Sequence, residues 1–363
     1  MSLRSPGASI DVRSAGSRET TVKFTSAIVC IAIFLAPQLC DAAAEERGPL
    51  DATEIERIVD LAMSEGLQSS GVPGASVAIV HKGSVLLAKG YGTADIVRGT
   101  PVTPDTPFRV ASLSKVLTAT AVVRLAEQGS LDLHEDIARY LDLPLQRDFP
   151  DAITAHSLLT HTAGFETTDI GDAAQTPHDV MPLTQFVRSC MVRQSHAPGE
   201  IYAYSNHGFA LLGLLIERAT GMPFDAAMQE LVLQPLGMNR SSFAQPLPGP
   251  LQRDISQSYS DSRIALTRDY SQVGPADALV STANDMAKFM IAQLRGHPAI
   301  EPGVLATMQA QQYAPYRTRY GISYAWHENT FRGHRALEHS GGQLGFSSYL
   351  AILPDDDFGF FIT

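Results

Sequence analysis

Cysteine is scarce in this sequence, which contains three: Cys30 and Cys40 near the N-terminus and Cys190 in the body of the chain. A single thiol in the body cannot form an internal disulfide, and no cysteine–histidine spacing is typical of a zinc site. We expect Cys190 to be a small buried apolar residue. We also expect neither a metal nor another cofactor.

Basic residues are few as well. Lys and Arg number 27 against 38 Asp and Glu, which gives a formal net charge of −11. Without a lysine–arginine cluster, the chain lacks the positive surface that nucleic-acid binding requires. The motifs G-x-S-x-G and H-E-x-x-H do not occur, which argues against an α/β-hydrolase and against a metallohydrolase.

Apolar runs long enough to cross a bilayer are missing too. Four basic residues precede a short apolar run at 27–36, and small residues follow at 42–44. This is the pattern of a secretory signal peptide over residues 1–44. We expect a secreted or periplasmic protein with no stable membrane insertion after cleavage. An uncleaved membrane anchor and lipoprotein processing at Cys40 are the alternatives.

The remaining chain predicts an α+β fold, an antiparallel sheet flanked by helices with an inserted all-α domain. β-type segments lie near both ends, and the long middle is mainly helical. We therefore expect a sheet domain from residues 45–105 and 320–363, and a mainly helical domain from 106–319. The predicted helices are 51–68, 112–128 and 208–219, and the predicted strands are 75–80, 84–88, 321–326, 346–353 and 358–363.

Ser112 and Lys115 form the first chemical motif, S-x-x-K. Residues three apart share one helix face, so the hydroxyl and the amine can touch. Serine is a weak nucleophile until a base removes its proton, and lysine serves as that base when burial lowers its pKa. A lysine at a helix end that points into solvent is the alternative interpretation of the motif.

Two further elements carry polar groups. Tyr204-Ser205-Asn206 precedes the helix at 208–219, and His339-Ser340-Gly341-Gly342 precedes the penultimate strand. Considered alone, the first is a helix N-cap with a packed tyrosine, and the second is a hairpin turn. Considered with Ser112, they supply a phenol, an amide, an imidazole and backbone N–H groups to one hydroxyl.

The order and spacing of these three elements resemble the serine β-lactamase and penicillin-binding protein family. The resemblance is strongest to the class C branch, which contains β-lactamases, DD-peptidases, D-aminopeptidases and esterases. It runs from Ile55 to Thr363 and includes segments 158–164, 235–238 and 279–285, which we interpret as scaffold. It implies an α/β sandwich beside a helical domain, with the site between them. It also implies a final helix on the sheet, whereas this chain ends at Thr363.

The resemblance implies catalytic roles for three residues. Ser112 is the nucleophile, Lys115 its activating partner, and Tyr204 the general base or proton relay. Asn206 is implied as a ligand of the substrate amide.

The last element is implied to bind substrate and the oxyanion. It comprises His339, Ser340, Gly341 and Gly342, and Gly342 supplies the second oxyanion N–H. The sequence departs from the family here, because His339 occupies the place of the usual lysine. Histidine is cationic only below its pKa, which is about 6.5 when unperturbed. This departure favours an esterase or peptidase over an efficient β-lactamase.

We therefore expect a secreted serine hydrolase that forms an acyl-enzyme on Ser112. Its substrate is a small molecule or peptide with an amide or ester bond: a β-lactam, a D-amino-acid peptide or a small ester. The alternative is a penicillin-binding or cell-wall-peptide sensor domain that acylates without efficient turnover.

Overall fold

The computed structural model describes residues 51–363 except 167, 299, 301 and 315–320. The predicted leader at 1–44, with Cys30 and Cys40, lies outside the described residues. In the part of the chain that is described, no helix is long and apolar enough to cross a membrane.

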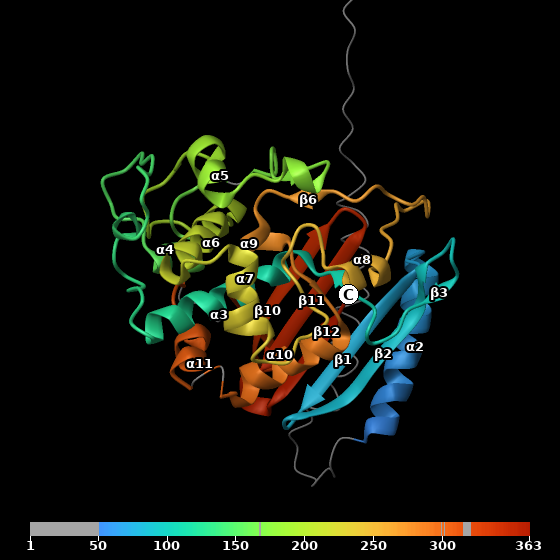
Figure 1. Cartoon of the computed structure of the whole chain (residues 1–363). Helices are drawn as coiled ribbons and strands as arrows, with labels where there is room; N and C mark the ends of the chain where they lie inside the picture. Colours follow the sequence, from blue (N-terminus) through green and yellow to red (C-terminus); the bar gives the residue numbers. More distant parts are fainter. Residues whose placement is uncertain (1–50, 167, 299, 301, 315–320) are drawn as a thin grey trace, which may run out of the picture.

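An eight-stranded sheet is built from both ends of the chain (Figure 1). Its order is β3-β2-β1-β12-β11-β10-β9-β8, and the paired neighbours are antiparallel. The predicted α+β class with an antiparallel sheet is confirmed. The strands are β1 Gly74–His81, β2 Ser84–Asp95, β3 Thr100–Pro101, β8 Ile322–Ser323, β9 Trp326–Phe331, β10 His334–Gln343, β11 Phe346–Leu353 and β12 Phe358–Ile362.

Strand β1 is buried on both faces because its side chains alternate between two cores. Val77 and Ile79 pack in the cluster beneath helix α2 (Ala52–Ser70), whereas Ala78 and Val80 join the main core. A two-residue turn with positive φ at Lys82 and Gly83, the geometry of a type I′ turn, connects β1 to β2.

Helices fill the segment between the two halves of the sheet. Helices α3 and α6 are buried nearly all round, and α10 lies across one face of the sheet (Figure 1). Cys190 ends α5 as a half-buried free thiol beside the main core. The elements are η1 Ala111–Leu113, α3 Ser114–Glu127, α4 Ala155–Leu159, α5 Leu183–Cys190, α6 Asn206–Thr220, α7 Phe224–Met228, the π-helix Gln229–Leu233, α8 Gly249–Asp254, α9 Gly274–Asp277, α10 Ala283–Arg295 and α11 Pro302–Gln309; the short strands are β4 Phe108–Arg109, β5 Ala173–Ala174, β6 Tyr270–Ser271 and β7 Val280–Ser281.

The sequence pattern did not indicate strand β10. The segment 339–342, which considered alone would be a hairpin turn, lies inside this strand and pairs with β11. Glycine and serine have low strand propensity, so pattern analysis places a break there. Glycine is nevertheless required at 341, because a Cβ atom there would lie 2.3 Å from the carbonyl oxygen of Val110.

Candidate active site

Ser112 lies on a short turn that joins β4 to α3. The preceding residue, Ala111, has a φ of +50°, a left-handed conformation that costs an alanine about 1–2 kcal/mol. Neighbouring elements hold this turn: Leu279 O accepts the Val110 N–H at 3.0 Å, and Ser348 Oγ donates to Val110 O at 2.7 Å. The serine is therefore presented by a turn that the sheet and the β4–β7 pair keep in place.

Lys115 lies directly below this serine. Its Nζ is 3.0 Å from Ser112 Oγ, 2.8 Å from Asn206 Oδ1 and 3.1 Å from the carbonyl oxygen of Ala276. The side chain is fully buried. The expected contact between the hydroxyl and the amine is thus present in the structure.

Burial lowers the pKa of Lys115 to about 7, because an ammonium group loses most of its hydration inside the protein. The carboxylates of Asp277, Asp172 and Asp169 act in the opposite direction. A substantial fraction of this amine is therefore neutral near pH 7 and able to accept a proton.

Tyr204 lies against both Ser112 and Lys115. Its hydroxyl is hydrogen-bonded to Ser112, and its ring centroid is 4.7 Å from Lys115 Nζ. Burial raises the pKa of the Tyr204 phenol well above its usual value, and its hydrogen bond with Ser112 only partly offsets this. The phenol therefore stays protonated near pH 7.

Asn206 begins helix α6, with Ser205 as its N-cap. Its amide has two partners: Oδ1 accepts from Lys115, and Nδ2 donates to Asp172 at 3.3 Å. Asp172 also bonds to His207 Nε2 at 2.9 Å. The helix start thus places an amide between the buried lysine and a carboxylate.

Strand β10 forms another wall of the site. Strand β9 pairs with β10 only over His334–Glu338, and no strand among the described residues covers the same edge at 339–343. Gln343 and Phe346 close a two-residue turn to β11, so the next pair, Gly342 and Ser347, directs its backbone groups away from the ladder. No atom lies within 4 Å of where a Gly342 Cβ would be, and Gly342 lines the cavity beside Ser112.

His339 lies behind Tyr204 and does not line the cavity. Its ring is 6.3 Å from the Tyr204 ring and 5.2 Å from that of His327. Nδ1 is 2.7 Å from Ser340 O, which can only accept, so Nδ1 carries the proton. Burial lowers the pKa of His339 well below its usual value, so this imidazole is neutral near pH 7.

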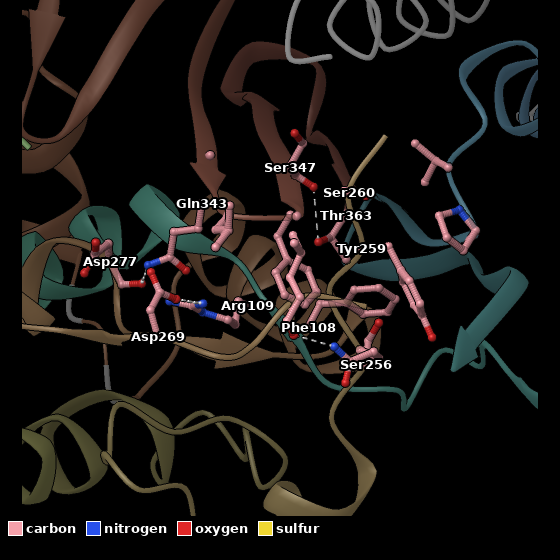
Figure 2. A pocket seen from close by; sticks show the side chains of 18 of the residues that line it. Phe108, Arg109, Ser256, Tyr259, Ser260, Asp269, Asp277, Gln343, Ser347 and Thr363 are labelled. Carbon is pink, nitrogen blue, oxygen red and sulfur yellow. Dashed lines mark hydrogen bonds and ion pairs between the residues drawn. The ribbon is translucent and has the colours of Figure 1, made fainter. Parts of the chain in front are cut away.

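A cavity of about 1030 Å³ opens beside Ser112 and is lined by Asn206 and Gly342 as well. Figure 2 shows the part of it where Asp277, Gln343 and the Arg109–Asp269 ion pair lie together. The charged residues of its lining are five aspartates and one arginine: Asp169, Asp172, Asp261, Asp269, Asp277 and Arg109. Burial raises the pKa of Asp277. Even with Asp277 counted as neutral, four aspartates face one arginine, so the lining carries net negative charge.

The structure thus brings Ser112, Lys115, Tyr204 and Asn206 together and places Gly342 at the same cavity. Ser340 and Gly341 lie beside them on β10, although neither lines the cavity. Sequence reasoning missed the carboxylates near Lys115, because Asp169, Asp172 and Asp277 belong to no motif. It also assigned His161, which stacks on Tyr204, to the scaffold.

Comparison with known proteins gives a consistent picture. The Beta-lactamase family model matches residues 59–363. The chain is 26% identical over 311 residues to "Protein flp" of Staphylococcus aureus, covering 83% of this chain but 61% of that protein, and so spans about three fifths of its length. It is 32% identical over 214 residues to "Esterase EstB" of Burkholderia gladioli, which is 55% of this chain and 54% of the esterase.

A solved structure shows the same fold. The "Beta-Lactamase/D-Alanine Carboxypeptidase from Pseudomonas syringae" superposes with a TM-score of 0.72 and 22% identity, over 85% of this chain and 92% of the other.

Proposed function

Because this chain belongs to the Beta-lactamase family, we propose that it is an acyl-enzyme-forming serine hydrolase whose substrates are esters or amides without a free carboxylate. The single observation that carries the proposal is the contact of Lys115 Nζ with Ser112 Oγ at 3.0 Å inside a buried site. The basic and apolar leader at 1–44 supports a further proposal, that the enzyme acts outside the cytoplasm.

Acylation begins with Ser112. Its Oγ attacks the carbonyl carbon while its proton passes to the neutral amine of Lys115. The oxyanion faces the N–H groups of Ser112 and Gly342. As the carbon–oxygen bond of the ester breaks, the leaving alkoxide takes a proton from Tyr204, and Lys115 returns one to the phenol.

Deacylation reverses these roles. A water molecule attacks the acyl carbon and gives its proton to Lys115 through Tyr204. The Ser112 oxygen leaves with that proton, and the acid product is released. Tyr204 acts as a relay that begins and ends each half-reaction protonated, consistent with the raised pKa of its phenol.

The charges around the site support esters or neutral amides over β-lactams and D-Ala-D-Ala peptides, which carry a carboxylate. His339 is buried and neutral, and Arg109 is paired with Asp269. Among the described residues that line the cavity, a substrate carboxylate would therefore meet aspartates and no unpaired arginine or lysine.

The test combines labelling and turnover. The wild-type protein should react with a fluorescent fluorophosphonate at Ser112 and hydrolyse p-nitrophenyl butyrate, and Ser112→Ala should lose both. Nitrocefin and a D-Ala-D-Ala peptide should be poorer substrates. Labelling of Ser112 without turnover of any substrate would instead identify a sensor domain. Unchanged labelling in Ser112→Ala would remove the proposal.

A further inference from the structure

His161 lies directly behind Tyr204, in the turn that follows α4. Its side chain is buried, with 3% exposed. Its ring packs against the Tyr204 ring at a centroid distance of 4.4 Å and an interplanar angle of 32°. The same ring lies 5.2 Å from Phe209. One imidazole therefore supports two aromatic rings from α6 and the residues just before it.

Hydrogen bonds connect His161 to the backbone on both sides of Tyr204. The N–H of Ala203 donates to the His161 carbonyl oxygen at 2.8 Å, and the N–H of Ser205 donates to His161 Nδ1 at 3.1 Å. Tyr204 lies between these two residues in sequence. The two bonds therefore restrain the backbone on both sides of Tyr204.

The two supported rings are those that face the amine of Lys115. Lys115 Nζ lies 4.7 Å from the Tyr204 centroid and 5.7 Å from the Phe209 centroid. His161 therefore packs against both of the rings on which the Lys115 amine rests. Burial also lowers the pKa of His161 well below its usual value, so the ring adds no second positive charge beside Lys115.

His161 occupies this position despite two structural costs. Its φ is +56°, in the left-handed region that non-glycine residues rarely adopt. Because Nδ1 accepts from Ser205, the proton is on Nε2, which is buried and has no hydrogen-bond partner among the described residues. A site selected for packing alone would be better filled by a residue without these costs. Such outliers cluster at functional sites.

We propose that His161 is a positioning residue of the hydrolase: its ring and Nδ1 hold Tyr204, and through Tyr204 the amine of Lys115, within reach of Ser112. This inference rests on the proposed function. Histidine is suited to the role because it combines a flat stacking surface with an acceptor on its edge, whereas phenylalanine offers only the surface and asparagine only the acceptor.

Two variants separate the contributions. His161→Asn keeps an acceptor for Ser205 and tolerates the left-handed backbone but removes the ring; His161→Gly fits the backbone and leaves a space the size of imidazole. His156→Asn is the matched control, because His156 is on α4 and bonds to Tyr324, away from Tyr204. Wild type and Ser112→Ala are measured first, so failure of the proposed function is recognised independently.

We expect both His161 variants to lower kcat for p-nitrophenyl butyrate at least tenfold while KM stays within threefold of the wild-type value. We also expect them to change the apparent pKa of the acidic limb in the pH profile of kcat/KM. Added imidazole should restore part of kcat in His161→Gly, and His156→Asn should behave as wild type. Folded His161 variants with the wild-type kcat and the wild-type apparent pKa of the acidic limb would overturn the proposal. So would losses that follow the unfolded fraction and show no rescue by imidazole.

Discussion

At the residue scale, the proposed chemistry depends on one amine that is kept partly neutral by its surroundings. Lys115 is fully buried. Its three hydrogen-bond partners come from three elements: the turn at Ser112, the start of α6 and helix α9. Burial lowers its pKa and nearby aspartates limit the shift. The balance leaves the pKa of the amine near the working pH, where a general base is most effective.

We predict that kcat/KM for an uncharged p-nitrophenyl ester rises with pH through an apparent pKa of about 7. Below this pH the amine of Lys115 is protonated and cannot accept the Ser112 proton, so activity falls about tenfold per pH unit. The measurement is a pH–rate profile. Lys288→Gln is the control, because Lys288 is half-exposed and pairs with Asp285. A flat profile from about pH 5 to 9 would contradict the assignment.

At the element scale, the site depends on how closely β10 and β11 approach the turn that carries Ser112. Gly341 lies against Val110 and Ala111, and Ser348 bonds to the same Val110 carbonyl. The left-handed Ala111 is part of this contact. The sheet therefore determines the position of Ser112, the proposed nucleophile, although Ser112 itself belongs to the helical segment.

Gly341→Ala tests this contact. The new methyl group would lie 2.3 Å from both Val110 O and Ser348 Oγ, so the strand or the turn must move. We expect a loss of about 1–3 kcal/mol in the free energy of unfolding, and a larger fall in kcat than rise in KM. Urea unfolding of Gly342→Ala is the stability control, since its Cβ would meet no atom within 4 Å. Equal stabilities of the two variants would show that the contact is not tight.

At the scale of the whole molecule, net charge and cavity charge have the same sign. The chain has a formal net charge of −11, and the cavity carries five aspartates against one paired arginine. The low-dielectric walls of a cleft focus the electrostatic field of charges of one sign, and this field slows the association of substrates with the same sign of charge. The field of the molecule therefore opposes carboxylate substrates before they reach Ser112.

We predict that Asp169→Asn raises kcat/KM for a carboxylate-bearing ester about three- to tenfold more than for its neutral methyl-ester analogue. Added salt should narrow the wild-type preference for the neutral compound by screening. Asp261→Asn should act in the same direction, because Asp261 lines the same cavity, but it should leave the pH profile unchanged, because Asp261 is not among the carboxylates that act on Lys115. If Asp169→Asn changed kcat/KM equally for both substrates, the hypothesis that cavity charge excludes carboxylate substrates would be wrong.

Local sequence by itself determined much of this protein. The α+β class, helices α2, α3 and α6, and the β1–β2 hairpin follow from hydrophobic periodicity and turn residues, which act over a few positions. The Ser112–Lys115 contact follows from helical spacing. The family resemblance could be stated from three motifs and is confirmed by the family match.

Only the tertiary structure decided how those motifs act on one another. Strand β10 was missed because glycine and serine are poor strand formers, and pairing with β11 overrides that preference. The carboxylates around Lys115, the burial that neutralises His339 and the stacking of His161 on Tyr204 join residues far apart in the chain. Electrostatic and packing energies depend on distance in space and on burial, and neither can be derived from residue order alone.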